Sequence, residues 1–431
     1  MALGVPSPVI AGEGSGHDLL RFSTAGSVDD GKSTLIGRLL YETKQIFDDQ
    51  LAAIERTSKQ QGAEYLNLAL LTDGLRAERE QGITIDVAYR YFATPRRKFI
   101  IADTPGHVQY TRNMVTGAST AGLALILVDA RNGVVEQSRR HAVLSSLLGV
   151  ARVVVCINKM DLTNYDRDVY ERLKAEFSHF VSGLDFEEVR FIPISALHGD
   201  NVVSRSENMA WYDGATLLDY LETVPTTGSI NSAAADLRFP VQYVIRPHSH
   251  RHHDYRAYAG QVASGTLRPG EPVVVLPAGL HTRVHSIDTF EGPLSEAAPP
   301  LSVALRLEDD VDVSRGDMIC RPGAEPRTEQ QFEAMLCWLA ATPLSLGKRY
   351  VIQHTTRTAR ALVPSLEYGL DVNTLGHDPS ASTLRMNEIG QATIKTSQPL
   401  FVDPYRANRA TGSFILIDEG TSNTVAAGMV L

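Results

Sequence analysis

The stretch that most constrains this chain is Gly26–Ser33, which reads GSVDDGKS. It fits the pattern G-x-x-x-x-G-K-[ST], in which a glycine-rich turn joins a strand to a helix. The residues from Phe22 alternate as a strand does, and helical spacing continues to Leu40. The two glycines let successive backbone N–H groups face one anion beside the positive end of a helix. A chance glycine turn is the alternative, but the order of elements predicts a phosphate-binding loop.

The side chains of this loop have separate predicted tasks. Lys32 would reach the β- and γ-phosphates of a nucleotide, and the Ser33 hydroxyl would hold Mg²⁺. The predicted phosphate-binding residues are Gly26, Ser27, Val28, Asp29, Asp30, Gly31, Lys32, Ser33, Thr34 and, from a later turn, Gly106.

Composition narrows the class of protein. A chain of 431 residues with 43% hydrophobic and 21% charged residues has the composition of a globular protein of about three domains. A net charge of −9 argues against a wide nucleic-acid-binding surface, so no stable nucleic-acid partner is expected. No apolar run reaches the length of a membrane span, and no membrane partner is expected. Cys156, Cys320 and Cys337 lie far apart, which favours a reduced cytoplasmic location.

The first 225 residues alternate strands and helices, after a tail over residues 1–19 that is predicted to be disordered. Leu123–Val128 and Val153–Ile157 are nearly all apolar, as parallel strands buried on both faces are. This pattern predicts a doubly wound, mostly parallel α/β domain over residues 20–225. The other expected strands are 86–91, 98–102 and 189–194, and the other expected helices are 43–60, 136–148, 165–181 and 217–222.

Asp103-Thr104-Pro105-Gly106-His107 follows one of these strands. It therefore lies at the carboxyl edge of the sheet, where α/β folds bind ligands. Asp103 could hold Mg²⁺ through water, and the Gly106 N–H could bond a γ-phosphate. The same residues also form a common turn sequence, so this stretch alone is an even choice.

Asn158-Lys159-Met160-Asp161 follows another buried strand. The Asp161 carboxylate could accept two hydrogen bonds from guanine, and adenine offers no such pair of donors. Asn158 would bond the base and the adjoining loop, and the Lys159 stem would lie over the ring. Ser195-Ala196-Leu197 would add a backbone N–H to the guanine oxygen. A solvated turn is the alternative for the Asn-Lys pair.

Gly82–Ile85 contains Thr84, whose hydroxyl could bind Mg²⁺ and whose N–H could bond the γ-phosphate. Loss of that phosphate would release the loop, as in a switch between order and disorder. The alternative is the start of a β-branched strand. Because all of these stretches occur in the right order, they predict a domain that binds GTP with Mg²⁺. The predicted switch residues are Thr84, Asp103, Thr104 and Pro105, and the predicted metal ligands are Ser33, Thr84 and Asp103.

The set GSVDDGKS, GITI, DTPGH, NKMD and SAL resembles the translation-factor class of GTPases. The resemblance implies that His107 positions the attacking water, although a lone histidine is more often structural. The longer stretches Asp73–Phe92 and Gly106–Thr120 resemble the GTPase (large) subunit of bacterial ATP sulfurylase, a sulfate adenylyltransferase. Gln81 stands where elongation factors usually carry Arg.

After Pro225 the sequence changes to short strands separated by turns. Linkers are expected at 226–236 and 321–330, and all-β barrel domains at 237–322 and 328–431. The resemblance to elongation-factor-like GTPases covers Asn387–Gly390 and Arg409–Phe414 in the last domain. The expected strands are 238–246, 255–265, 272–276, 302–307, 333–338, 349–353, 357–363, 387–396 and 414–418.

The resemblance implies a GTPase that couples GTP hydrolysis to the formation of adenylyl sulfate and pyrophosphate from ATP and sulfate. The adenylyl transfer would occur in a partner catalytic subunit, in a heterodimer or larger assembly, because this chain shows one convincing nucleotide site. The rival hypothesis is an elongation factor that delivers aminoacyl-tRNA. The role of His248, His250, His252 and His253 is open between a metal site and, with better odds, a surface hairpin loop.

Overall fold

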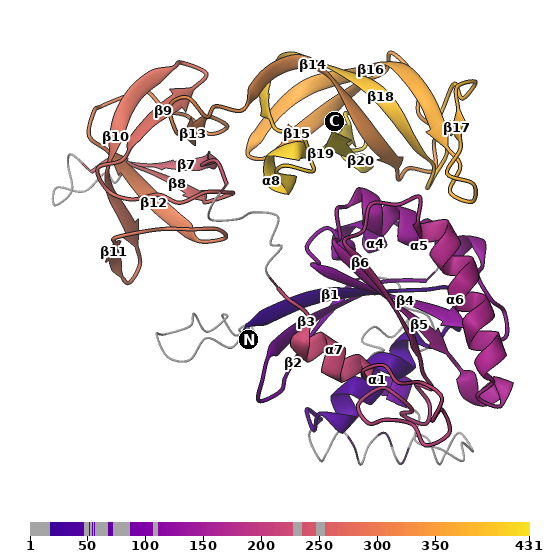
Figure 1. Cartoon of the computed structure of the whole chain (residues 1–431). Coiled ribbons are helices and arrows are strands. Elements are labelled where there is room, and N and C mark those ends of the chain that lie inside the picture. The colour runs from indigo at the N-terminus through magenta and orange to yellow at the C-terminus, as the bar shows by residue number, and fades with distance from the viewer. Residues whose placement is uncertain are drawn as a thin grey trace.

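The computed structural model describes residues 18–46, 51, 54, 56, 68–71, 87–106, 111–226, 235–246 and 255–431. Its first domain is a six-stranded sheet in the order β2-β3-β1-β4-β5-β6 (Figure 1). The strands β1, β3, β4, β5 and β6 run parallel, and β2 is antiparallel to β3. The strands are β1 Leu19–Ala25, β2 Ala88–Ala93, β3 Lys98–Asp103, β4 Leu123–Asp129, β5 Arg152–Asn158 and β6 Glu188–Pro193.

Helices pack on both faces of this sheet. In β4, Leu123, Leu125 and Leu127 pack with α1 and α7, whereas the alternate residues pack with α4, α5 and α6. This alternation confirms the predicted doubly wound α/β domain. No helix among the described residues is long and apolar enough to cross a membrane. The helical segments are α1 Lys32–Glu42, η1 Leu68–Leu71, α4 Thr111–Ala118, α5 Glu136–Leu147, η3 Met160–Thr163, α6 Arg167–Val181 and α7 Leu217–Thr223.

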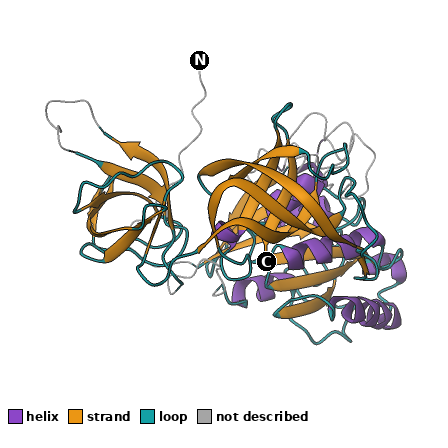
Figure 2. Cartoon of the chain, turned by 90° about the horizontal axis from the view of Figure 1, so that it is seen from above, coloured by secondary structure: helices purple, strands orange, loops and turns teal. Residues whose placement is uncertain are grey.

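Two β-barrel-like domains follow, and Figure 1 shows that nearly all the helices belong to the first domain. In Figure 2 the second domain, at the left, consists of strands and loops. The second domain has the strand order β11-β10-β12-β8-β7-β13-β9, which the β10–β9 pairing closes. The third has the order β15-β19-β20-β14-β18-β16-β17, which the β15–β16 pairing closes. The second-domain strands are β7 Phe239–Ile245, β8 Ala257–Gln261, β9 Pro272–Leu276, β10 Leu280–Thr289, β11 Gly292–Leu294, β12 Ser302–Leu307 and β13 Met318–Cys320. Those of the third domain are β14 Arg327–Trp338, β15 Arg349–His354, β16 Arg357–Leu370, β17 His377–Asp378, β18 Ile389–Val402, β19 Ser413–Asp418 and β20 Thr424–Val430, with the short helix α8 Arg409–Gly412.

Several boundaries differ from the sequence-based expectation. β14 begins at Arg327, inside the expected linker 321–330, because Arg327 pairs with Val402 of β18. α6 begins at Arg167, not Tyr165, because the Asp166 side chain caps it by accepting from the Asp168 N–H. The expected helix 43–60 starts later than expected, since residues 43–46 are not helical. Residues 51, 54 and 56 are helical, and the rest of that stretch lies outside the described residues. The strands β10, β11, β13, β17 and β20 were not predicted.

The first and third domains share one apolar core. Apolar residues of α4, α5 and β4 form a single buried cluster with residues of the third domain, including Met335, Tyr405 and Met429. The Tyr405 hydroxyl donates to the Leu148 carbonyl at 3.1 Å, just after α5. Burial lowers the pKa of Arg409, whose guanidinium binds carbonyls beyond the carboxyl ends of α4 and α5, where helix dipoles favour cations. These carbonyls belong to Ser119, Ala121 and Gly149.

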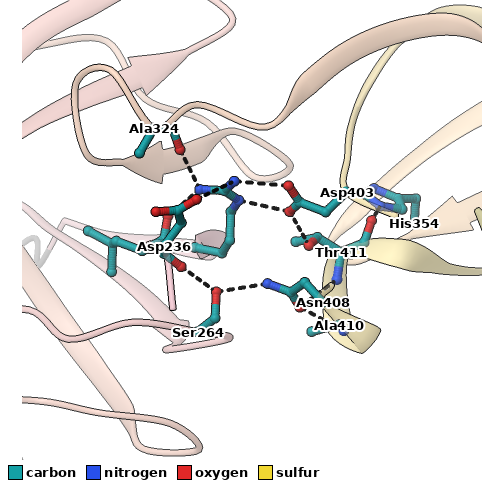
Figure 3. A network of polar contacts seen from close by, with 10 residues as sticks. Asp236, Ser264, Ala324, His354, Asp403, Asn408, Ala410 and Thr411 are labelled. Atoms are coloured by element: carbon teal, nitrogen blue, oxygen red, sulfur yellow. Dashed lines mark hydrogen bonds and ion pairs between the residues drawn. The ribbon is translucent and has the colours of Figure 1, made fainter. Parts of the chain in front are cut away.

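The contact between the two barrels is polar instead (Figure 3). Arg238 makes a bidentate ion pair with Asp403, at 2.8 and 2.9 Å. Burial alone would raise the pKa of Asp403, but hydrogen bonds from Arg238 and Thr411 hold it below its usual range. Asn408 donates to the Ser264 hydroxyl at 2.8 Å in the same network. The third domain therefore has an apolar contact on one side and a charged contact on the other.

Candidate nucleotide-binding site

The loop between β1 and α1 has the backbone that its glycines predict. Gly26 and Gly31 have φ values of 152° and 93°, and Asp29 has a φ of 65°. These left-handed conformations curl the loop around the start of α1. A Cβ atom on Gly31 would lie 2.5 Å from Nδ2 of Asn158, so no side chain fits at this position.

Two buried charges belong to this loop. Nζ of Lys32 donates to the carbonyls of Gly26 at 3.0 Å and Ser27 at 2.7 Å. Burial lowers the pKa of this ammonium. Oδ2 of Asp30 accepts from the Ser27 N–H at 2.6 Å, and burial raises the pKa of Asp30 to about 6. Desolvation therefore opposes both charged forms, and a bound phosphate would restore an anionic partner to Lys32.

The turn after β3 lies against this loop. The Thr24 hydroxyl donates to Oδ1 of Asp103 at 3.1 Å, and the Thr104 hydroxyl donates to the Thr24 carbonyl. A Cβ atom on Gly106 would lie 2.8 Å from the carbonyl oxygen of Gly26 and 2.4 Å from Nζ of Lys32, so only glycine permits this approach. The turn thus lies where its N–H groups can face the same phosphates as the loop. Thr84 and His107 lie outside the described residues.

Asn158 joins the phosphate end of the site to the base end. Its Nδ2 donates to the Asp30 carbonyl at 2.7 Å, and its Oδ1 accepts from the Ala196 N–H at 2.9 Å. The Ser195 N–H bonds the Asp200 carbonyl. The backbone N–H groups of Ser195 and Ala196 therefore already have protein acceptors. Of the three N–H groups predicted to bond the guanine oxygen, that of Leu197 remains the candidate.

Lys159 has a partner that sequence reasoning missed. Its Nζ forms an ion pair with Oδ2 of Asp129 at 2.9 Å. Asp129 is 1% exposed and also receives the Arg131 guanidinium at 2.7 Å. Burial alone would raise the pKa of Asp129, but the hydrogen bonds from Arg131 and Lys159 hold it at about 2. The signal was present, because Asp129 follows a buried strand as Asp103 does.

The Asp161 carboxylate is the group best suited to bond a base. Its Oδ1 is buried and has no hydrogen-bond partner among the described residues. The His198 ring lies nearby, with Nε2 3.9 Å from Oδ2. A buried carboxylate oxygen without a donor is costly, and the N–H edge of guanine would supply that donor. The residues present therefore fit a guanine nucleotide.

Arg38 supports the last loop of the site and was also missed from sequence. This α1 residue donates from Nε to the Ala196 carbonyl at 3.2 Å and from its guanidinium to the Leu197 carbonyl. The same guanidinium pairs with Glu42 at 3.4 Å. Because Arg38 and Asn158 hold the Ser195–Leu197 loop from two sides, the base end is rigidly connected to α1.

The donor set also fits Mg²⁺. Ser33 lies in the first turn of α1 and Asp103 at the end of β3, and both offer the hard oxygen ligands that this ion prefers. Elsewhere in the described part of the chain, no cluster of three His, Cys, Asp or Glu residues is placed to hold a metal. His248, His250, His252 and His253 lie outside that part.

Known families match this architecture. The family described as the elongation factor Tu GTP binding domain matches residues 17–226, and the GTP-eEF1A C-terminal domain-like family matches residues 331–431. The fold and site therefore define a guanine-nucleotide-binding GTPase of the elongation factor Tu class. Curated relatives place it further: "Bifunctional enzyme CysN/CysC" of Mycobacterium tuberculosis is 59% identical over 96% of this chain and 67% of that protein. "Sulfate adenylyltransferase subunit 1" of Bacteroides fragilis is 54% identical over 96% of this chain and 86% of that protein. The chain belongs to the sulfate adenylyltransferase subunit 1 family.

Proposed function

We propose that this chain hydrolyses GTP and couples the hydrolysis to formation of adenylyl sulfate and pyrophosphate from ATP and sulfate by a partner catalytic subunit. The observation that carries the proposal is the unpartnered buried Oδ1 of Asp161. A carboxylate there favours guanine and leaves the edge of adenine unpaired. The ATP of the sulfurylase reaction then needs a second site, on another subunit.

The described residues suggest how the chain binds the triphosphate. Lys32 and the N–H groups of the loop would hold the phosphates, and the Gly106 N–H would meet the γ-phosphate. Ser33 and Asp103 would hold Mg²⁺, which would supply neutralisation of the phosphate charge. His107 is the proposed residue that positions the attacking water. His107→Ala should therefore slow hydrolysis and leave GTP binding nearly intact.

The connection from the site to the third domain supports coupling. The turn that ends at Gly106 is followed closely in the chain by α4. From α4, Arg112 donates to the Thr424 carbonyl of the third domain at 2.8 Å. A change in the turn after loss of the γ-phosphate could therefore reach the barrels.

The relatives do not favour the rival hypothesis of aminoacyl-tRNA delivery. We place the protein in the cytoplasm, since Cys156, Cys320 and Cys337 are buried free thiols. Thr84 remains the proposed reader of the γ-phosphate.

The test measures adenylyl sulfate formed from ATP and sulfate at fixed concentrations of this chain and a sulfurylase catalytic subunit. The yield should rise with GTP and stay low with GDP, because a partner senses hydrolysis only if it distinguishes the two states. Thr84→Ala should abolish the difference. Equal yields with GTP, GDP and no nucleotide would overturn the proposed function.

A further inference from the structure

Part of one face of the sheet in the first domain is not covered by the described helices. The pairing register places Arg21 of β1 beside Ile100 of β3, and Ile100 beside Tyr91 of β2. The neighbouring row joins Leu19 to Lys98. Since residues directly opposite in a sheet point to the same side, these side chains form one surface. We call it the strand face, and it comprises Leu19, Arg21, Tyr89, Tyr91, Lys98 and Ile100.

The two sides of these strands differ sharply. On the other side, Phe22, Phe92 and Phe99 pack together in the core beneath α1. On the side of the strand face, α4 reaches the carboxyl ends of the strands, where a Cβ atom on Gly117 would touch Thr104 at 2.6 Å. Beyond α4, Tyr91 is 69% exposed, Tyr89 43% and Leu19 42%. Sheets of this class normally bury both faces, so the exposure needs an explanation.

The chemistry of the strand face indicates what would cover it. Exposed tyrosines and apolar residues lie beside Arg21, and this is the composition of a protein-binding centre, whereas the charged Lys98 suits its rim. Among the described strands, β2 also lies at the edge of its sheet, and an edge strand is a place where a partner can add to a sheet. The strand face therefore fits a protein surface that is apolar at its centre and acidic at its rim.

The strand face continues into a cleft of about 1090 Å³ between the three domains, which Leu19 and Arg21 also line. Among the described residues that line this cleft are four arginines, Arg21, Arg112, Arg152 and Arg409, and no Asp or Glu. The Arg152 charge is offset by Glu187 at 3.0 Å, outside the lining. The cleft thus extends the positive charge of the strand face, in a chain whose net charge is −9.

We propose that the strand face is the docking surface for the catalytic adenylyltransferase subunit, through an acidic and apolar patch of that subunit. This inference rests on the proposed function for the identity of the partner. β3 runs from Lys98 on this face to Asp103 at the nucleotide site, and Thr84 precedes β2 by four positions in the sequence. A partner docked here would touch both strands that flank the γ-phosphate-reading residues.

The test is the affinity of the full chain for separately purified catalytic subunit, by surface plasmon resonance with GTP present. The double variant Tyr89→Ser/Tyr91→Ser should bind at least about 30-fold more weakly, since buried tyrosines dominate such interfaces. Lys98→Glu should slow association about threefold to tenfold at low salt, with little effect at high salt. GTP affinity and intrinsic hydrolysis should be unchanged in both variants, because neither touches the nucleotide site.

Matched controls lie on the barrels. Tyr243→Ser, at a 66% exposed tyrosine of β7, and Lys395→Glu, at an exposed lysine of β18, should bind as the parent does. Parent-like binding by the strand-face variants would overturn the proposal. The proposal would also be overturned if Tyr91 were required only for self-association of the chain, or only for closure of its barrels, as measured by solution scattering. If the parent chain failed to bind the catalytic subunit at all, the proposed function itself would fail.

Discussion

At the phosphate end of the nucleotide site, the buried Lys32 and Asp30 bond main-chain groups of their own loop. At the base end, Lys159 and Arg131 both pair with Asp129. The first arrangement leaves charges that desolvation disfavours, and the second neutralises its charges within the protein.

The difference separates affinity from selectivity. Phosphates would supply the missing counter-charge for Lys32, so the phosphate end should provide most of the binding free energy. The base end is already organised around Asn158 and Asp129, and it leaves one carboxylate oxygen of Asp161 without a donor. That end should contribute less to affinity and decide which base is accepted.

The largest effect should follow Lys32→Ala. Removal of the ammonium should weaken binding of GTP and GDP by about 4 kcal/mol, because a buried charge partner of the phosphates is lost. Titration calorimetry measures this, with Lys44→Ala as a control outside the site. A loss below tenfold for both nucleotides would show that the phosphate end does not dominate affinity.

Asp161→Asn should have an intermediate effect and act on selectivity. Loss of a charge-assisted pair should cost GTP about 2–3 kcal/mol, and xanthine nucleotide should gain because its exocyclic oxygen accepts from an amide. Competition binding with the two triphosphates measures the exchange. Unchanged GTP affinity would remove Asp161 from the base end.

The smallest effect concerns Asp30 and pH. Its pKa in the folded protein is about 6 against an ordinary 3.8, so the folded state retains a proton that the unfolded state releases. Stability conferred by this group is therefore present below about pH 4 and lost as the pH rises to about 6. Asp30→Asn should gain up to about 2 kcal/mol of unfolding free energy relative to the parent, and the gain should appear across that window.

Urea unfolding of the nucleotide-free protein at several pH values measures this gain. The control is Asp29→Asn, because Asp29 is the exposed neighbour. A gain from Asp30→Asn that did not vary with pH would show that the phosphate end carries no such desolvated carboxylate.

The parts of the nucleotide site that could be predicted from the sequence are those formed by short contiguous motifs. The glycine turn, the Asp103–Gly106 turn and the Asn158–Asp161 stretch each carry their chemistry within a few neighbouring residues. Asp129 follows a buried strand, which was a usable signal, but its pairing with Lys159 could not be predicted from that position. Arg38 was missed because its role depends on a distant partner, the Ala196 carbonyl, 158 residues away. No local pattern encodes such a contact.

The same reason separates predicted from missed elements. The apolar runs within β4 and β5 can be recognised as strands from the sequence, because a strand that is buried on both faces has apolar residues at successive positions. β10 reads LHTRVHSIDT, and its polar residues face solvent on one side of a barrel whose closure brings in distant strands. The Arg238–Asp403 pair likewise joins residues 165 positions apart. Topology, not local composition, determines both.

The apolar core that α4 and α5 share with Met335, Tyr405 and Met429 has a consequence for dissection of the molecule. A fragment cut near Pro225 would present that half-core to water, and we expect it to precipitate on expression. The second domain, by contrast, lies in the sequence between the first and third domains, which share this apolar core. For protein engineering, the second domain is therefore the one that can be deleted, whereas the first and third domains must be kept together.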